Sequence, residues 1–363
     1  MIGSRAGRVI EAWMSSAPAG DPLLPPLRPK ALGPSKRSRT TLNAMKPTIP
    51  EKMKTAAIDR FGGPEVIHTQ TLPVPVPKAD EVLIQLDTAG IGVWDPYVRE
   101  GELAGASARF PLVIGNDGAG TVAAVGAEVE RFRAGDRVYA FTMKGGFYAE
   151  YVAVEEDGVA AIPPGLKTEE AGALGADGIT ALCGLEDQLE LRAGQKLLVF
   201  GASGGIGHIA VQLAKRIGAN VLAVASGADG VALVRRLGAD VAVDGRHDDI
   251  ARTVRTFAPD GLDAALVLVN GDGLGEALGL FKKGGRVAYP NGVEPAPEAP
   301  KGVAAFAYDG EPDRKAFERL NQLIGGSAFH VELGRVYRLE DAALAHREIG
   351  KHHLGKLAFR IHG

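Results

Sequence analysis

The glycines of the segment VFGASGGIG, residues 199–207, have the spacing of a turn that binds phosphate groups. The segment contains an A-x-G-x-x-G pattern that starts at Ala202. A side chain at the glycine positions would hold a pyrophosphate away from the free N–H groups at the start of the following helix. The alternative is a tight turn without a ligand, but the flanking strand and helix favour a dinucleotide site. The residues of this predicted site are Gly201, Ala202, Ser203, Gly204, Gly205, Ile206 and Gly207.

The end of the next predicted strand indicates which dinucleotide binds. An NAD site usually has Asp or Glu there, because the carboxylate accepts a hydrogen bond from the ribose 2′-hydroxyl. Here the strand ends AVAS, so Ser226 occupies the position at which NAD sites have Asp or Glu. Against this, Asp229 adds a negative charge nearby. We therefore predict NADPH as the cofactor. The candidate partners of its 2′-phosphate are Arg235, Arg236 and Arg246.

The composition indicates a globular chain of one very large domain or two ordinary ones. It has 363 residues, of which 45% are hydrophobic. No apolar run approaches the roughly 18 residues that a membrane helix needs. The single cysteine, Cys183, excludes an intramolecular disulfide and any zinc site built from several thiolates, and we interpret it as a small core residue. A chain with one cysteine suits a reducing compartment, and we expect a cytoplasmic location.

Residues 1–52 differ in composition from the rest of the chain. They hold nine Lys or Arg against three acidic residues, whereas the remainder holds 32 basic and 41 acidic residues. The proline-rich stretch over residues 21–41 cannot form a helix or a central strand. We interpret residues 1–52 as a disordered extension that folding and turnover do not need. The alternatives are an organelle transit peptide or a start codon placed too early. The acidic remainder argues against nucleic-acid binding.

The pattern of apolar residues changes along the chain. From Met53 to about residue 175, short apolar runs separated by Gly, Pro and Asp predict a β-barrel or sandwich. From about residue 195, strands alternate with helices, among them one over 204–218 and one over 273–283. This alternation predicts an α/β domain whose parallel sheet has helices on both faces. After about residue 310, a helix and two short strands return to the first domain.

The chain from Met53 to its end resembles the zinc-independent medium-chain reductases of the quinone oxidoreductase, or zeta-crystallin-like, group. The matching segments, in order, are KTAAIDRFGGPEV, GNDGAGTVAAVG, AGDRVYAF, GGFYAEYVAV, DGITAL, GASGGIGHIAVQLAK, LGAD, KKGGRV and HHLGKLAFRI. The resemblance implies a GroES-like β-rich catalytic domain, a Rossmann doubly wound parallel sheet, a cleft between them, NADPH and a homodimer. We therefore expect a catalytic domain over residues 53–177 and 311–363, and an NADP-binding domain over residues 178–310.

The resemblance also implies which residues surround the cofactor, and that no metal takes part. Zinc-dependent relatives have a histidine ligand where this chain has Asn116, and their structural zinc needs a cysteine cluster that is missing here. We interpret Asn116 and Asp117 as turn residues. A further role for Asp117 is to hold the polar network of the cleft. His352 and His353 are expected at the surface. The resemblance places these residues at the cofactor: Thr180, Val269, Asn270, Tyr289 and Lys356.

The segment AGIGVWDPYVREG, residues 89–101, resembles the substrate loop of the family. Asp95 and Tyr97 match the family pattern and are our candidate catalytic residues, with Tyr97 as the donor to the substrate oxygen and bound water as its competitor. Gly92 and Val93 replace an Asn-Pro pair, which removes an amide that could hold a quinone oxygen. Trp94 either forms a wall for an aromatic substrate or packs internally.

These observations together predict an NADPH-dependent, zinc-free reductase that transfers hydride to quinones or α,β-unsaturated carbonyls. Such acceptors suit a site without a metal, because delocalisation stabilises the anion that hydride transfer produces. Two alternatives stay open at this point. One is a zinc-free reductase of another carbonyl substrate, and the other is a non-catalytic nucleotide-binding protein.

Overall fold

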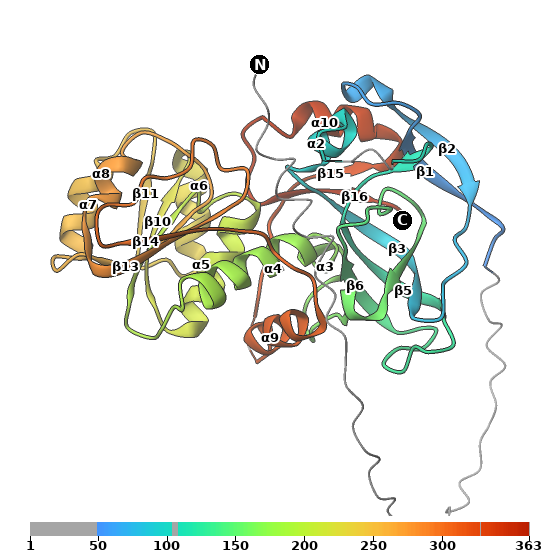
Figure 1. Ribbon diagram of the computed structural model, residues 1–363, viewed down its shortest axis with the longest axis horizontal. Coiled ribbons are helices and arrows are strands. Elements are labelled where there is room, and N and C mark those ends of the chain that lie inside the picture. The colour runs from blue at the N-terminus through green and yellow to red at the C-terminus, as the bar shows by residue number, and fades with distance from the viewer. Residues whose placement is uncertain (1–48, 104–107, 327, 363) are drawn as a thin grey trace, which may run out of the picture.

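The computed structural model describes residues 49–103, 108–326 and 328–362, so most of the basic extension lies outside the described residues. Three sheets organise the chain, and they form two parts that lie side by side in Figure 1. The fold class predicted from the sequence, a GroES-like part and a parallel Rossmann sheet, is confirmed.

The catalytic part consists of a three-stranded and a seven-stranded sheet. The smaller sheet has the order β2-β1-β4, and the larger has the order β15-β16-β3-β5-β6-β8 with β7 paired to β3. β16 pairs antiparallel with β3, so the C-terminal strands return to the first part of the chain, as predicted. The strands are β1 (Lys52–Ile58), β2 (Ile67–Pro73), β3 (Glu81–Ile91), β4 (Leu112–Val113), β5 (Asp117–Val125), β6 (Arg137–Phe141), β7 (Tyr151–Glu155), β8 (Val159–Ala161), β15 (Leu333–Arg338) and β16 (Lys356–Arg360).

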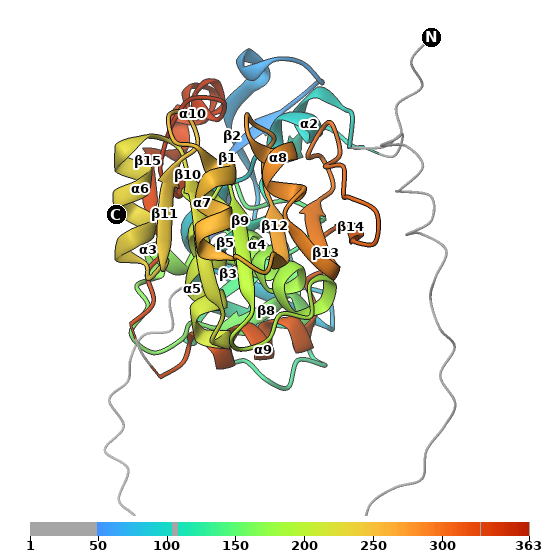
Figure 2. The same ribbon diagram turned by 90° about the vertical axis from the view of Figure 1, so that its left-hand side faces the viewer.

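The nucleotide part contains one parallel six-stranded sheet with the order β11-β10-β9-β12-β13-β14 (Figure 2). Along β9, Leu197 and Val199 belong to one apolar cluster, while Leu198 and Phe200 belong to another. Helices therefore cover both faces of this sheet, as the alternation in the sequence predicts. Its strands are β9 (Lys196–Phe200), β10 (Asn220–Ala225), β11 (Val241–Asp244), β12 (Leu262–Val267), β13 (Phe281–Pro290) and β14 (Ala304–Tyr308).

The helices join and cover the sheets. A 3₁₀ turn precedes β2 (Pro64–Val66), another precedes β8 (Glu156–Gly158) and a third precedes α10 (Leu339–Asp341). Cys183 begins a π-helical segment, Cys183–Gln188, and is buried, in line with a core residue. The helices are α2 (Asp95–Glu100), α3 (Thr168–Ala171), α4 (Gly175–Leu182), α5 (Gly205–Ile217), α6 (Gly227–Arg236), α7 (Ile250–Phe257), α8 (Leu274–Leu278), α9 (Arg314–Ile324) and α10 (Ala342–Glu348).

One predicted helix is shorter in the structure than in the sequence pattern. We expected a helix over residues 273–283, but α8 ends at Leu278 and β13 begins at Phe281. Phe281 pairs with Leu262 of β12, so backbone bonds of the sheet replace the last helical turn. The apolar residues near this point do not distinguish a short helix followed by a strand from one continuous helix.

Candidate active site

The glycine turn joins β9 to α5, and its geometry leaves room for a ligand. A Cβ atom on Gly207 would lie 2.2 Å from the carbonyl oxygen of Gly201, so close packing within the turn requires glycine at position 207. A Cβ atom on Gly204 would meet no protein atom closer than 3.6 Å. Gly204 is the N-cap of α5, and no side chain caps this helix. The open space at an uncapped helix N-terminus fits the pyrophosphate of a dinucleotide.

A buried histidine, which sequence reasoning missed, holds this turn. The ring of His208 lies between the Gly204 carbonyl oxygen, 2.9 Å from Nδ1, and the Glu332 N–H, whose nitrogen is 3.0 Å from Nε2. Both bonds form only when Nδ1 carries the proton. Burial lowers the pKa of His208 to about 4, so the ring is neutral at physiological pH. His208 therefore ties the phosphate-binding turn to the chain segment that precedes β15.

A buried lysine lies directly behind the glycine turn. The Nζ atom of Lys356 is 2.8 Å from Oδ2 of Asp117 on β5 and 3.3 Å from Oδ1 of Asp177 on α4. Burial by itself would lower the pKa of Lys356, but the two carboxylates raise it above its ordinary value. Burial also raises the pKa of Asp117, against the opposing effect of the lysine. The three side chains join three distant segments of the chain.

This ion cluster and the glycine turn are in direct contact. Gly355, just before the lysine, forms a bridge with Gly204, and its N–H donates to the carbonyl oxygen of Ser203 at 2.8 Å. A Cβ atom on Gly205 would lie 2.2 Å from Oδ2 of Asp177. Sequence reasoning pointed to Lys356 and Asp117 but gave no signal for Asp177.

At the end of β10, the structure brings together residues that sequence reasoning treated separately. Ser226 is the N-cap of α6, and its N–H donates to the hydroxyl of Ser203 at 3.2 Å. The carboxylate of Asp229 lies 3.0 Å from Nε2 of His352, whose Nδ1 is 3.5 Å from a guanidinium nitrogen of Arg246. His352, expected only as a surface residue, therefore belongs to this group.

Two other arginines proposed for the 2′-phosphate have different partners. Arg235 donates to the carbonyl oxygen of Ala242 at 3.2 Å, and Arg236 lies 3.4 Å from the carboxylate of Glu332. Of the three candidates, only Arg246 lies beside the group at the end of β10.

The residues predicted at the nicotinamide differ in their environments. The hydroxyl of Thr180 donates to the carbonyl oxygen of Ala176 within α4, at 2.8 Å. Val269 is half-exposed beside Gly201, and Asn270 donates to the carbonyl oxygen of Pro295. The ring of Tyr289 packs against the apolar cluster on the α7–α8 face of the sheet. The structure therefore places Val269 at the turn, while Tyr289 is partly buried and packs against this cluster.

The predicted substrate loop connects β3 to α2 and is fixed by a buried carboxylate. Asp95 is fully enclosed and accepts hydrogen bonds from the N–H of Gly92 at 2.7 Å and from the hydroxyl of Tyr148 at 2.6 Å. Burial raises the pKa of Asp95 to about 6. Tyr97, one helical half-turn further on, keeps 44% of its surface exposed. Its ring centre lies 5.8 Å from that of Trp94.

Behind Asp95, a chain of buried hydrogen bonds extends into the catalytic part. Oη of Tyr148 lies 3.1 Å from Nε2 of His346, and Nδ1 of His346 accepts from Arg99 at 2.9 Å. Burial and the charge of Arg99 lower the pKa of His346 to about 3, so the ring is neutral. Sequence reasoning missed Tyr148, Arg99 and His346, which stabilise the loop that carries Tyr97.

Comparisons with known proteins match both parts of the chain. Residues 78–164 match the alcohol dehydrogenase GroES-like domain, and residues 205–303 match the family described as zinc-binding dehydrogenase. A quinone oxidoreductase from Sus scrofa is 31% identical over 309 residues, which cover 82% of this chain and 94% of that protein. The chain belongs to the quinone oxidoreductase family of medium-chain reductases.

Two further similarities add to this family assignment. An NADPH-dependent alkenal/one oxidoreductase from Arabidopsis thaliana is 33% identical over 69% of this chain and 65% of that protein. A mycobacterial protein solved in complex with NADPH has a TM-score of 0.73 at 27% identity, and covers 85% of this chain and all of that one. The chain is thus an enzyme of a nicotinamide-dependent oxidoreductase family.

The family description names zinc, whereas Asn116 stands where the sequence resemblance expects a histidine ligand of zinc-dependent relatives. The side-chain amide of Asn116 donates to the carbonyl oxygen of Thr142 at 2.8 Å, so this residue serves as turn structure. Across residues 49–103, 108–326 and 328–362, no three His, Cys, Asp or Glu side chains gather closely enough to hold a metal ion.

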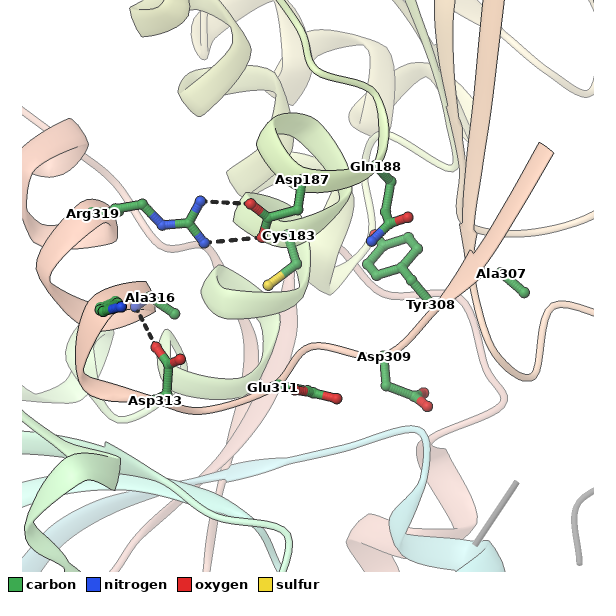
Figure 3. Close-up of a pocket in the computed structure, with 11 residues that line it drawn as sticks. Cys183, Asp187, Gln188, Ala307, Tyr308, Asp309, Glu311, Asp313, Ala316 and Arg319 are labelled. Carbon is green, nitrogen blue, oxygen red and sulfur yellow. Dashed lines mark hydrogen bonds and ion pairs between the residues drawn. The ribbon is translucent and has the colours of Figure 1, made fainter. Parts of the chain in front are cut away.

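A large open cavity of about 670 Å³ lies away from the glycine turn, between the π-helical segment, the end of β14 and α9 (Figure 3). Its polar groups already have structural roles. The carboxylate of Asp187 pairs with Arg319 at 2.7 and 2.9 Å, and Asp313 caps α9. Burial raises the pKa of the Cys183 thiol in its wall to about 11, so the thiol stays protonated. We therefore take the glycine turn, rather than this cavity, as the candidate active site.

None of the helices in the described part of the chain is both long enough and apolar enough to cross a membrane.

Proposed function

We propose that the protein is a metal-free, NADPH-dependent reductase of quinones or α,β-unsaturated carbonyls. The observation that carries this proposal is the hydrogen bond from the side-chain amide of Asn116 to the carbonyl oxygen of Thr142. We infer that Asn116 does not hold a metal, so a hydrogen-bond donor rather than a Lewis acid would meet the substrate oxygen. A loop on the catalytic part that carries the part-exposed Tyr97 supports it. The family relatives that reduce quinones or alkenals, by their names, agree with this substrate class.

The chemistry follows from charge development at the substrate. The bound nicotinamide would supply a hydride to an electron-poor carbon. The substrate oxygen then gains negative charge, which delocalisation in a quinone or enone partly stabilises. We assign Tyr97 as the catalytic donor to this oxygen, because it matches the family pattern of the substrate loop and keeps 44% of its surface exposed on α2. Asp95, which is buried, acts as a positioning residue through Gly92 and Tyr148.

On the cofactor side, the chain's residues bind and orient the dinucleotide. The N–H groups at the start of α5 would hold the pyrophosphate above Gly204. Lys356 and His208 are positioning residues, since each bonds to protein groups that support the turn. We assign Thr180, Val269 and Asn270 to the nicotinamide end of the cleft.

The preference for NADPH rests on the end of β10. Ser226 presents no carboxylate there, and the carboxylate of Asp229 is bound by His352. Arg246 lies beside this histidine and would add positive charge near a 2′-phosphate.

Substitution Ser226→Asp is expected to reduce the ratio of kcat/KM for NADPH to that for NADH by about 10–100-fold, which corresponds to about 1.4 kcal/mol per tenfold. A carboxylate at this position would repel the 2′-phosphate and accept from a free 2′-hydroxyl. The measurement compares both cofactors with one quinone. Ser226→Ala serves as a neutral control and should keep the NADPH preference. Equal use of the two cofactors by the wild type, or a preference for NADH, contradicts the proposal.

The proposed activity is tested by NADPH oxidation across a panel of quinones, enones and simple aldehydes. We expect turnover with the quinones or enones and little with the aldehydes, before and after treatment with a metal chelator. Turnover only with simple carbonyls would indicate a different substrate class. Binding of NADPH without any turnover would indicate a nucleotide-binding protein rather than a reductase.

We also propose a homodimer that forms through β14. This strand is at the edge of the six-stranded sheet, and its exposed residues Ala304, Ala305 and Ala307 are small and uncharged. Such an edge can pair with a second copy of itself.

We further propose a cytoplasmic location, and domain boundaries at residues 177 and 310.

A further inference from the structure

Trp94 begins the segment that carries the proposed catalytic tyrosine. Its carbonyl oxygen accepts from the N–H groups of Tyr97 at 3.0 Å and Val98 at 3.2 Å, which makes it the N-cap of α2. The next residue, Asp95, is anchored to Tyr148 inside the catalytic part. The backbone at Trp94 is therefore held on both sides, and the indole projects from a fixed position.

The indole contacts the nucleotide part on the other side of the cleft. A Cβ atom on Gly292 would lie 2.5 Å from Cη2 of Trp94 and 3.0 Å from its Cζ2, so the outer edge of the indole rests against this glycine. Gly292 has φ of +96°, a conformation that residues with side chains rarely adopt. Substitution there would both strain the backbone and displace the indole.

The loop that receives the indole is itself fixed and lies on the ligand side of the sheet. Asn291 donates its N–H to the carbonyl oxygen of Tyr308 at 2.8 Å and its amide to Asp309 at 2.8 Å. Gly292 follows the carboxyl end of β13, and ligands of open parallel sheets bind beyond these strand ends. α2 and the loop after β13 are neighbours in Figure 2. Trp94 thus bridges the substrate loop and the loop after β13, two segments that hydrogen bonds hold in place.

We propose that Trp94 sets the size of substrate that this cleft admits, selecting flat single-ring quinones or short enones against acceptors with three fused rings. The inference rests on the proposed reductase function. The indole and the ring of Tyr97, 5.8 Å apart between centres, line the substrate loop with aromatic surface. Gly92 has no side chain, and a Cβ atom there would lie 3.5 Å from the carboxylate of Asp95, so the indole is the largest side chain at this point of the loop.

The test compares kcat/KM for 1,4-benzoquinone and 9,10-phenanthrenequinone, with NADPH, in the wild type, Trp94→Phe and Trp94→Ala. We expect the ratio of the three-ring to the one-ring value to rise about tenfold or more in Trp94→Ala, and by an intermediate factor in Trp94→Phe. Phe132→Ala, an aromatic truncation in the loop between β5 and β6, is the matched control and should leave the ratio unchanged. A ratio equal to the wild-type value in both Trp94 variants would overturn the inference.

A second readout separates this inference from the proposed function. The chain has two tryptophans, Trp13 and Trp94, so a Trp13→Phe variant has a single indole reporter. Saturating NADPH, with binding verified by calorimetry, should quench the emission of Trp94 because the reduced ring absorbs at the wavelengths that tryptophan emits. Quenching without turnover of any acceptor would contradict the reductase but keep Trp94 in the cleft. Unchanged emission with NADPH bound would place Trp94 outside the cleft and overturn the inference.

Discussion

Replacing Lys356 by methionine should lower the free energy of unfolding by about 3–5 kcal/mol. The substitution keeps most of the side-chain volume but leaves Asp117 and Asp177, which are 2% and 16% exposed, without their shared cation. Breaking a buried ion pair from one side costs more than the pair contributes, because an unpaired charge stays in the protein interior. Equilibrium unfolding in urea at pH 7 to 8 measures the difference.

The pH dependence of this loss gives an internal check. Burial already raises the pKa of Asp117 with the lysine present, and removal of the lysine raises it further. A carboxyl group whose pKa is higher in the folded than in the unfolded state binds its proton preferentially in the folded state as the pH falls. The deficit of Lys356→Met relative to the wild type should therefore shrink between pH 8 and pH 5.

The matched control is Lys282→Met. The Lys282–Asp263 pair, at 3.1 Å, is partly exposed, with 38% of the lysine side chain accessible. Solvent screening limits its contribution to about 0–1 kcal/mol. Equal losses in the two variants would show that the burial of the Lys356 cluster has no energetic consequence, contrary to our interpretation.

Replacing Tyr97 by phenylalanine should lower kcat by about 10–1000-fold, at about 1.4 kcal/mol per tenfold. The ring and its contact with Trp94 stay, and only the hydroxyl is lost. A donor that acts only in the transition state affects kcat, whereas a residue that merely lines the cleft changes KM. Steady-state kinetics with one quinone, together with a deuteride isotope effect that shows chemistry to be rate-limiting, makes this measurement.

Tyr151→Phe provides the control for the loss of a tyrosine hydroxyl. Tyr151 lies on β7 within the catalytic part, where it pairs with Gln85 of β3. This variant should keep the wild-type kcat. If Tyr97→Phe also keeps it while chemistry limits the rate, bound water is the proton source and Tyr97 has no catalytic role.

Much of the fold could be predicted because its signals are local. The glycine spacing from Gly201 to Gly207 follows from the steric demands of one turn, and the helix predicted over residues 204–218 agrees with α5 to within one residue at each end. Each strand of the parallel sheet is a short run of apolar residues. Such a run can be recognised from adjacent positions in the sequence alone. The prediction failed at residues 279–283, where pairing of Phe281 with β12 overrode a helical pattern.

The candidate site could be predicted only in part. Sequence pattern and family resemblance pointed to Ser226, Tyr97 and the glycine turn, and these lie on the two parts that form the cleft. Residue type alone did not show that Asp95 is a buried anchor or that the indole of Trp94 reaches Gly292. Burial and partner identity depend on what packs against a residue, and neighbours in sequence do not determine that.

The sequence by itself therefore determined the order of strands and helices, the phosphate-binding turn and the absence of an acid at position 226, because each depends on adjacent residues and their backbone preferences. Only the tertiary structure decided which charges meet. Lys356 pairs with Asp117, 239 positions away, and His208 bonds to the backbone of Glu332, 124 positions away. Electrostatic and hydrogen-bond energies depend on distance in space, so these contacts exist only once the folded chain brings these distant segments together.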